Sequence, residues 1–140
     1  MPAFLLALVL SLASADAVAD SGFSVSGRVT GYLPGHIVYL ALYDSEENFK
    51  ATRFSASLRF TPDKLPSDTL EYRFKNIKPG EYMIACFQDL NGDRKINIGF
   101  FGPTEPYATY RSTTGMFGPK FGKCRFAVDR DIASADMSLK

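Results

Sequence analysis

Residues 78–89 read Lys-Pro-Gly-Glu-Tyr-Met-Ile-Ala-Cys-Phe-Gln-Asp, and this stretch decides the fold class. Lys78-Pro79-Gly80 is a turn signal, and Glu81 to Phe87 is a short run that is apolar on both faces of a strand. A strand of that kind is buried on both sides and lies inside a sheet. Ile37 to Tyr43 has the same character. We therefore predict two central strands, Ile37 to Tyr43 and Glu81 to Phe87.

Other short segments rich in β-branched and aromatic residues lie on either side of these two strands, separated by turn signals. They are Phe23 to Val29, Phe54 to Phe60, Leu70 to Phe74, Phe121 to Val128 and Ile132 to Leu139. Leu70 to Phe74 alternates apolar and polar residues, as a strand with one buried face does. Phe54 to Phe60 is weaker and favours a strand or an irregular edge, and the acidic stretch Asp44 to Asn48 is expected to form a loop. Helical periodicity is absent, so the prediction is an all-β, antiparallel, immunoglobulin-like β-sandwich of about seven strands.

The first residues have the pattern of a secretory leader. Met1 to Ala15 is an apolar stretch followed by small residues, and it is too short to span a bilayer. Small-x-small cleavage sites end at Ala15 and at Ala19, although no Lys or Arg precedes the apolar stretch. A buried N-terminal helix is the alternative. We expect residues 1–19 to be a signal peptide and 20–140 a single domain, periplasmic or secreted from a bacterial envelope.

Charge and motifs argue for a binding or structural module. Sixteen Lys and Arg residues nearly balance fifteen Asp and Glu residues and are scattered, so nucleic acid and anionic membranes are disfavoured as partners. His36 is the only histidine, and the chain has neither a Gly-x-Ser-x-Gly elbow nor a zinc-type His/Cys cluster. These features disfavour a catalytic role, and no catalytic residue is predicted.

The most specific chemical pattern is the stretch 89–97, Asp-Leu-Asn-Gly-Asp-Arg-Lys-Ile-Asn. Oxygen-bearing side chains recur at every second position, as in the first half of an EF-hand, and calcium takes six to eight oxygen ligands. The candidate ligands are Asp89, Asn91, Asp93, the Lys95 carbonyl, Asn97 and, from further along, Glu105. Gly92 falls at the fourth loop position rather than the sixth, and Phe100 stands where an EF-hand has its bidentate Glu. A metal-free polar turn is the alternative, and a calcium site here would be structural and weak, with Kd on the order of 0.1 to 1 mM.

Two further features point to structure and to partners. Cys86 and Cys124 are the two cysteines of a chain expected to be exported, which favours a disulfide over two separate buried thiols. The loop from Asp89 to about Met116 is aromatic as well as rich in Gly and Pro. Its candidate binding residues for a glycan or an envelope protein are Phe101, Tyr107 and Tyr110, with folding of these rings over the core as the alternative.

The stretch Lys78 to Asn97 resembles the bacterial domain of unknown function 2141 family, which shows a Pro-Gly-x-Tyr strand followed by a His-Asp-x-Asn-x-Asn/Asp-x-Lys-x-Asp/Asn loop. Gly102 to Tyr107 and Phe121 to Phe126 resemble later segments of that family. The chain departs from the pattern at Gln88, where the family usually has His, and at the adjacent Gly102-Pro103. The resemblance implies a transthyretin-like or carboxypeptidase-regulatory-like sandwich and brings no established activity.

The sequence thus predicts an exported, non-enzymatic sandwich of unknown role, calcium-stabilised and binding an envelope component or glycan. The rival hypothesis is a small envelope hydrolase that uses carboxylates of the 89–105 loop. A cleft between two facing carboxylates would favour the hydrolase, whereas oxygens that converge on one point would favour calcium.

Overall fold

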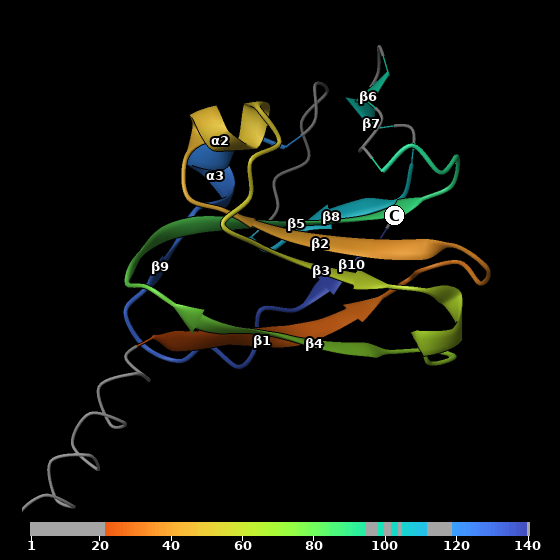
Figure 1. Ribbon diagram of the computed structural model, residues 1–140, viewed down its shortest axis with the longest axis horizontal. Helices are drawn as coiled ribbons and strands as arrows, with labels where there is room; N and C mark the ends of the chain where they lie inside the picture. Colours follow the sequence, from red (N-terminus) through yellow and green to blue (C-terminus); the bar gives the residue numbers. More distant parts are fainter. Residues whose placement is uncertain (1–21, 95–97, 100–101, 104, 112–118, 140) are drawn as a thin grey trace, which may run out of the picture.

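The computed structural model describes residues 22–94, 98–99, 102–103, 105–111 and 119–139 (Figure 1). The predicted signal peptide, Lys95, Asn97 and Phe101 lie outside these residues. No helix in the described part of the chain is long and apolar enough to cross a membrane.

Two sheets face each other across the core, as Figure 1 shows. The larger sheet has the order β3-β2-β5-β8, and β9 pairs with a further part of β5. Its strands are β2 (Ile37–Tyr43), β3 (Ala56–Phe60), β5 (Gly80–Asp89), β8 (Tyr107–Thr109) and β9 (Phe126–Val128). The smaller sheet has the order β10-β1-β4, with β1 (Phe23–Thr30), β4 (Leu70–Ile77) and β10 (Met137–Ser138). The short strands β6 (Ile98–Gly99) and β7 (Gly102–Pro103) pair with each other.

The predicted all-β sandwich is confirmed, and so are its two central strands. β2 and β5 pair antiparallel from Ile37 opposite Asp89 to Tyr43 opposite Met83, and each has another strand on its far side. The weaker segment Phe54 to Phe60 contains the edge strand β3. The described pairings are antiparallel except where β10 and Ile132 run parallel to β1.

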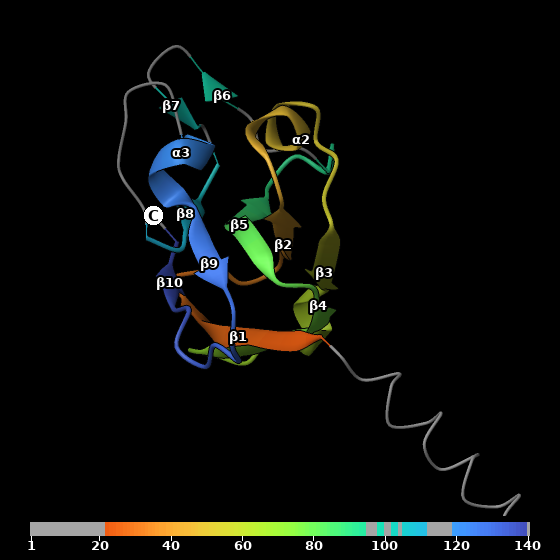
Figure 2. The same ribbon diagram turned by 90° about the vertical axis from the view of Figure 1, so that its left-hand side faces the viewer.

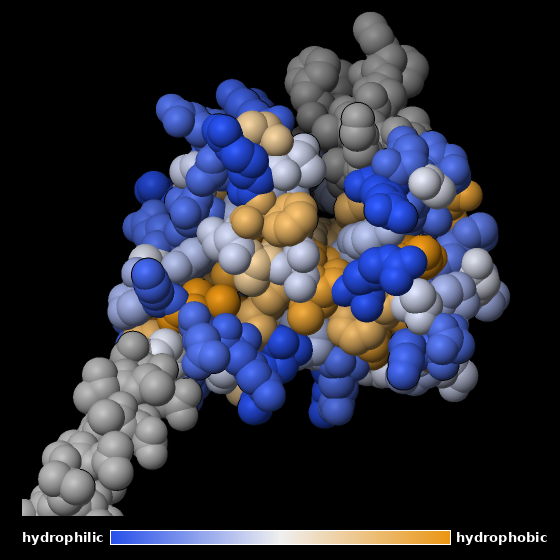
Figure 3. Space-filling view, viewed as in Figure 1, coloured by the Kyte–Doolittle hydropathy of each residue, from blue (hydrophilic) through white to orange (hydrophobic). Residues whose placement is uncertain are grey.

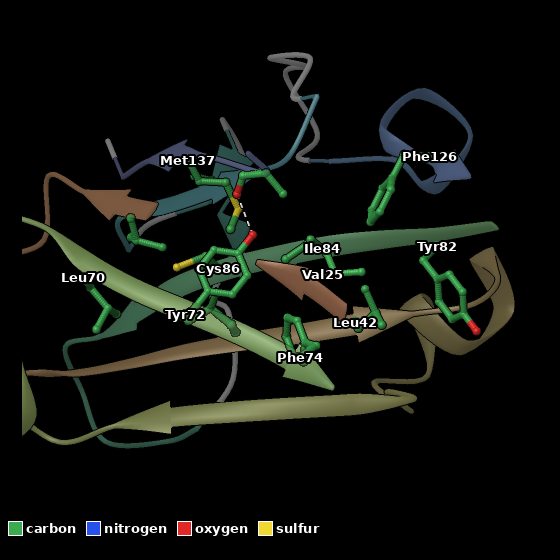
Figure 4. Close-up of a cluster of buried hydrophobic side chains, with 14 of the residues drawn as sticks. Val25, Leu42, Leu70, Tyr72, Phe74, Tyr82, Ile84, Cys86, Phe126 and Met137 are labelled. Atoms are coloured by element: carbon green, nitrogen blue, oxygen red, sulfur yellow. Dashed lines mark hydrogen bonds between the residues drawn. The ribbon is translucent and has the colours of Figure 1, made fainter. Parts of the chain in front are cut away.

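The main core fills the space between the two sheets. β4 alternates buried Leu70, Tyr72 and Phe74 with exposed residues, so one face of the smaller sheet is apolar. Facing it are fully buried side chains of the larger sheet, Leu40, Leu42 and Ile84 among them. Figure 4 shows Leu42 and Ile84 meeting Tyr72 and Phe74 between the sheets. Burial of such side chains stabilises a fold by roughly 1.5 to 3 kcal/mol each.

Two predicted elements differ in the structure. Part of the expected acidic loop is a short helix, α2 (Glu46–Lys50), because the Ser45 hydroxyl accepts a 3.1 Å hydrogen bond from the Asn48 amide and caps its start. The segment Phe121 to Val128 begins with a second short helix, α3 (Phe121–Cys124), and only its end is a strand. A 3-10 turn, η2 (Pro62–Lys64), lies between β3 and β4.

A second apolar cluster covers the outer face of the larger sheet at one end. Alternate residues of β5 point to opposite faces, so Ile84 and Cys86 enter the main core while Met83 and Ala85 point outward. The outward residues pack with Tyr43, Phe121 and Cys124. Figure 2 shows α2 and α3 on the side of the larger sheet that faces away from β1 and β4.

The predicted disulfide is wrong for this structure, in which both cysteines are free thiols. Cys86 belongs to the main core, whereas Cys124 is carried by α3 on the opposite face of the sheet. The Cys124 thiol instead lies 3.5 Å from the Thr109 hydroxyl. Burial raises the pKa of the Cys86 thiol well above its usual range, so this group stays protonated and unreactive.

The C-terminal segment is held against β1 along its length. Ala135 donates its amide to the Ser26 carbonyl at 3.0 Å, and Leu139 donates to Thr30 at 2.8 Å. The Ala135 carbonyl accepts a hydrogen bond from the buried Tyr72 hydroxyl. The close approach depends on Gly27, because a Cβ atom at that position would lie 2.1 Å from the Ala135 oxygen.

Candidate metal site at the ends of strands β5 and β8

Three carboxylates meet where β5 ends and β8 begins. Asp89 is the last residue of β5, Asp93 lies in the turn after it, and Glu105 precedes β8 by two residues. One oxygen from each lies within 4.8 Å of the others. Asp89 and Glu105 are buried, at 5% and 6% exposure, and Asp93 is exposed. The structure therefore brings together three of the six predicted calcium ligands.

The turn itself is built on Asp89. Its two carboxylate oxygens accept amide hydrogen bonds from Gly92 at 2.8 Å and from Arg94 at 2.9 Å. Gly92 and Arg94 have φ of 80° and 64°, left-handed conformations that Gly adopts without steric cost. The Asn91 side-chain oxygen accepts from the Asp93 amide at 3.1 Å. The hydrogen bonds of the polar-turn interpretation are thus present together with the convergence of carboxylates.

Glu105 contacts the same turn from the segment that precedes β8. Its Oε2 accepts the Leu90 amide at 2.6 Å, across fifteen residues of sequence. Sequence spacing alone does not place this residue beside Asp89, because its position depends on the antiparallel pairing of β5 with β8. Lys95 and Asn97, the remaining predicted ligands of the stretch, lie outside the described residues.

The geometry suits one divalent ion. Calcium is bound by oxygens at about 2.3 to 2.6 Å, so two oxygens on the same ion are at most about 5 Å apart. The three carboxylate oxygens lie within 4.8 Å of one another and so meet that condition. Like charges at such separation repel strongly where water is partly excluded, and a divalent cation offsets that repulsion.

A buried amide side chain supports the same end of the sheet. Gln88 is fully buried, and its Oε1 accepts the Leu33 amide at 2.7 Å. Its Nε2 donates to the carbonyls of Leu33 and His36, at 2.5 and 3.2 Å. Gln88 stands where the resemblance implies His, and here it fixes the turn before β2 to the strand that carries Asp89.

An aromatic row crosses the outer face of the larger sheet beside the carboxylates. Tyr39, Phe87 and Tyr107 are opposite one another on β2, β5 and β8, and each is half-buried. The rings of Tyr39 and Phe87 stack with centroids 5.3 Å apart and planes 20° apart. Asp89 lies two residues beyond Phe87 on the same face of β5. Tyr107 was predicted from the loop composition, whereas Tyr39 and Phe87 join it only through the strand register.

The other predicted binding aromatics have different positions. Tyr110 is half-buried and packs edge-on against Phe126, with centroids 5.1 Å apart, at the margin of the main core. Phe101 lies outside the described residues. Of the three candidates, Tyr107 is the one that the structure places in the row.

Fold and site together define a β-sandwich whose sheet end carries a cluster of carboxylates. The sequence profile of a bacterial family described as an uncharacterized protein conserved in bacteria (DUF2141) matches residues 35–135. The chain belongs to this family, as the resemblance in the Asp89 loop predicted. No curated protein and no solved structure matches the chain significantly.

Proposed function

We propose that the chain is an exported, non-enzymatic β-sandwich module that binds calcium structurally at the joined ends of β5 and β8. The observation that carries the proposal is the convergence of Asp89, Asp93 and Glu105 within 4.8 Å. Glu105 supplies the carboxylate that the EF-hand-like stretch lacks at Phe100. The ion would tie the turn after β5 to the strand that follows it.

Export is supported by the leader pattern in residues 1–19. Protein recovered from the envelope of cells that express the full chain should begin at Asp16 or Asp20. Mass spectrometry of the intact protein tests this directly. A mature product that retains Met1 to Ala15 would contradict export by a cleaved signal peptide.

Calcium should raise the melting temperature of the mature protein, because an ion that binds only the folded state stabilises it by RT ln(1 + [L]/Kd). At about 10 mM calcium and a Kd near 1 mM the gain is roughly 1.4 kcal/mol, or about 3 to 6 °C for a domain of this size. Asp93→Asn should abolish this increment. Because Asp93 is exposed, the substitution should cost the calcium-free protein less than about 1 kcal/mol.

Asp129→Asn is the matched control, since Asp129 is also an exposed loop aspartate but lies outside the cluster. This variant should keep the full calcium increment. Magnesium serves as the second control, because it demands near-ideal octahedral geometry and gives up its water ligands reluctantly. An unchanged melting temperature with calcium, or an equal increment in Asp93→Asn, would show that the loop is only a turn.

The hydrolase hypothesis receives less support from the same geometry. The two carboxyl groups of glycosidases stand about 5 to 5.5 Å apart in retaining enzymes and about 6.5 to 9.5 Å apart in inverting ones, flanking the bond that breaks. Here one oxygen of each carboxylate lies within 4.8 Å of the others, and those of Asp89 and Glu105 already accept backbone amides. This arrangement favours an ion over a glycosidic bond between the carboxylates.

The aromatic row favours a glycan as the partner of the module. Half-buried rings in register give an apolar strip on the sheet surface, against which the apolar face of a sugar ring can pack. We expect the mature protein to bind a subset of sugars on a glycan array, with Tyr39→Ala weakening binding about tenfold. Phe54→Ala, which removes an exposed aromatic ring outside the row, should leave binding unchanged. Equal binding by the Tyr39→Ala variant would contradict this role of the row.

A further inference from the structure

A second candidate site lies along the free edges of β3 and β4. These strands end their respective sheets, and Figure 2 shows them on the same side of the molecule. A cavity of about 700 Å³ opens there. It is lined by Arg28, Arg59, Phe60, Lys64, Pro66, Thr69, Leu70 and Glu71. None of these residues belongs to the carboxylate cluster.

The lining of the cavity is cationic. It holds three basic side chains and one carboxylate, Glu71, which pairs with Arg28 at 3.6 Å. Arg59 and Lys64 form no ion pair with the described residues. The guanidinium of an arginine presents a planar fork of N–H donors that fits carboxylate and phosphate oxygens. The two unpaired cations therefore favour an anionic group.

One neighbouring acidic residue, Asp63, interacts electrostatically with Lys64 and offsets part of its charge. Asp63 accepts a hydrogen bond from the Thr61 hydroxyl, which lowers the pKa of its carboxyl. Burial and, to a smaller extent, the charge of Asp68 raise the pKa of Tyr32, whose hydroxyl donates a 2.7 Å hydrogen bond to the Pro66 carbonyl. Neither aspartate lines the cavity.

Apart from Thr69, the rest of the lining is apolar. Phe60 is half-buried at the end of β3, and Leu70 is buried at the start of β4, with Pro66 between them in sequence. Figure 3, which views the side where β3 and β4 lie, shows a band of apolar surface bordered above and below by hydrophilic residues. An inorganic anion would leave the accessible parts of Phe60 and Pro66 in contact with water. An anion joined to an apolar chain would cover them.

We propose that this cavity binds an amphipathic anion, a carboxylate or phosphate monoester attached to an apolar chain. Arg59 and Lys64 hold the anionic group, and the chain lies against Phe60, Pro66 and Leu70. Such a group is available as a free amphiphile or as part of a membrane lipid, and the shared chemistry is the same. The proposal is independent of calcium and of the carboxylate cluster.

The test is an NMR titration of the isotope-labelled mature protein with decanoate, acetate and inorganic phosphate in parallel. Decanoate should shift the amides of residues 59–60, 64 and 69–71, and should bind at least about tenfold more tightly than acetate, because burial of two methylenes is enough for that ratio. Co-sedimentation with vesicles that contain an anionic lipid separates the two sources. Binding of dispersed decanoate alone assigns the site to a free amphiphile, and binding of both probes assigns it to lipid.

Arg59→Gln should weaken decanoate binding about 10- to 100-fold, the range expected for loss of a charge-assisted hydrogen bond. Arg59 is exposed, so this change should leave the fold intact. Arg53→Gln removes an exposed arginine outside the cavity and should bind as the parent does. Equal affinity for acetate and decanoate, vesicle binding without decanoate binding, or undiminished binding by Arg59→Gln would overturn the proposal.

Discussion

Gly27→Ala should lower the free energy of unfolding by about 3 kcal/mol or more, a large share of the stability of a domain of this size. The added Cβ would lie 2.1 Å from the Ala135 oxygen and 2.4 Å from its carbonyl carbon. The Ala135 backbone cannot move away freely, because its amide donates to the Ser26 carbonyl and its carbonyl accepts from the Tyr72 hydroxyl. The clash is therefore relieved only by detaching the C-terminal segment from β1.

Urea denaturation followed by circular dichroism measures this loss, and the melting temperature should fall by about 10 °C or more. Gly122→Ala is the matched control, since a Cβ at Gly122 would meet nothing within 4 Å. That variant should be as stable as the parent, or slightly more stable because alanine favours the helix α3. A Gly27→Ala protein with the stability of the parent would contradict the close packing of β1 on residues 132–139.

Gln88→Leu should cost about 3 kcal/mol although it preserves side-chain volume. The substitution removes three hydrogen bonds and leaves the Leu33 amide and two carbonyls without their partner. Each such loss costs about 1 to 3 kcal/mol where the groups stay away from water. Hydrogen exchange of the Leu33 amide should accelerate together with the loss of stability.

Gln88→Glu keeps the size of the side chain and tests the effect of a charge at the same position. A carboxylate still accepts the Leu33 amide but brings negative charge toward the carbonyls of Leu33 and His36 in a site with no exposure. We expect this variant to be less stable than Gln88→Leu, because an unpaired buried charge is more costly than lost hydrogen bonds. If Gln88→Leu unfolds at the same urea concentration as the parent, the hydrogen bonds of Gln88 contribute nothing to stability.

Local patterns were sufficient for the centre of the fold. β2 has the predicted bounds and β5 contains the predicted segment, because apolar residues on both faces indicate a central strand. The two short helices were missed since neither is long enough to show a helical period. The turn at Asp89 was predicted from its polar spacing, as its amide hydrogen bonds are local.

The sequence named Glu105 as a candidate ligand, but the positions of residues that meet through long-range strand pairing could not be predicted from it. Glu105 meets Asp89, and Tyr39 meets Phe87, through strand pairings that no local pattern specifies. The disulfide prediction failed for a related reason. The inward direction of Cys86 follows from strand alternation, but the face that α3 covers, and with it the position of Cys124, is set by packing.

The pairing of residues 132–139 with β1 bears on when the protein can fold. Asp131 and Asp136 accept the amides of Ser24 and Arg28 across 107 and 108 residues of sequence. The smaller sheet therefore stays incomplete until nearly the whole described chain has been synthesised, and such distant contacts form slowly. Under the export proposed above, the chain would be threaded through a translocation pore before it folds, and this order of assembly would give it time to do so.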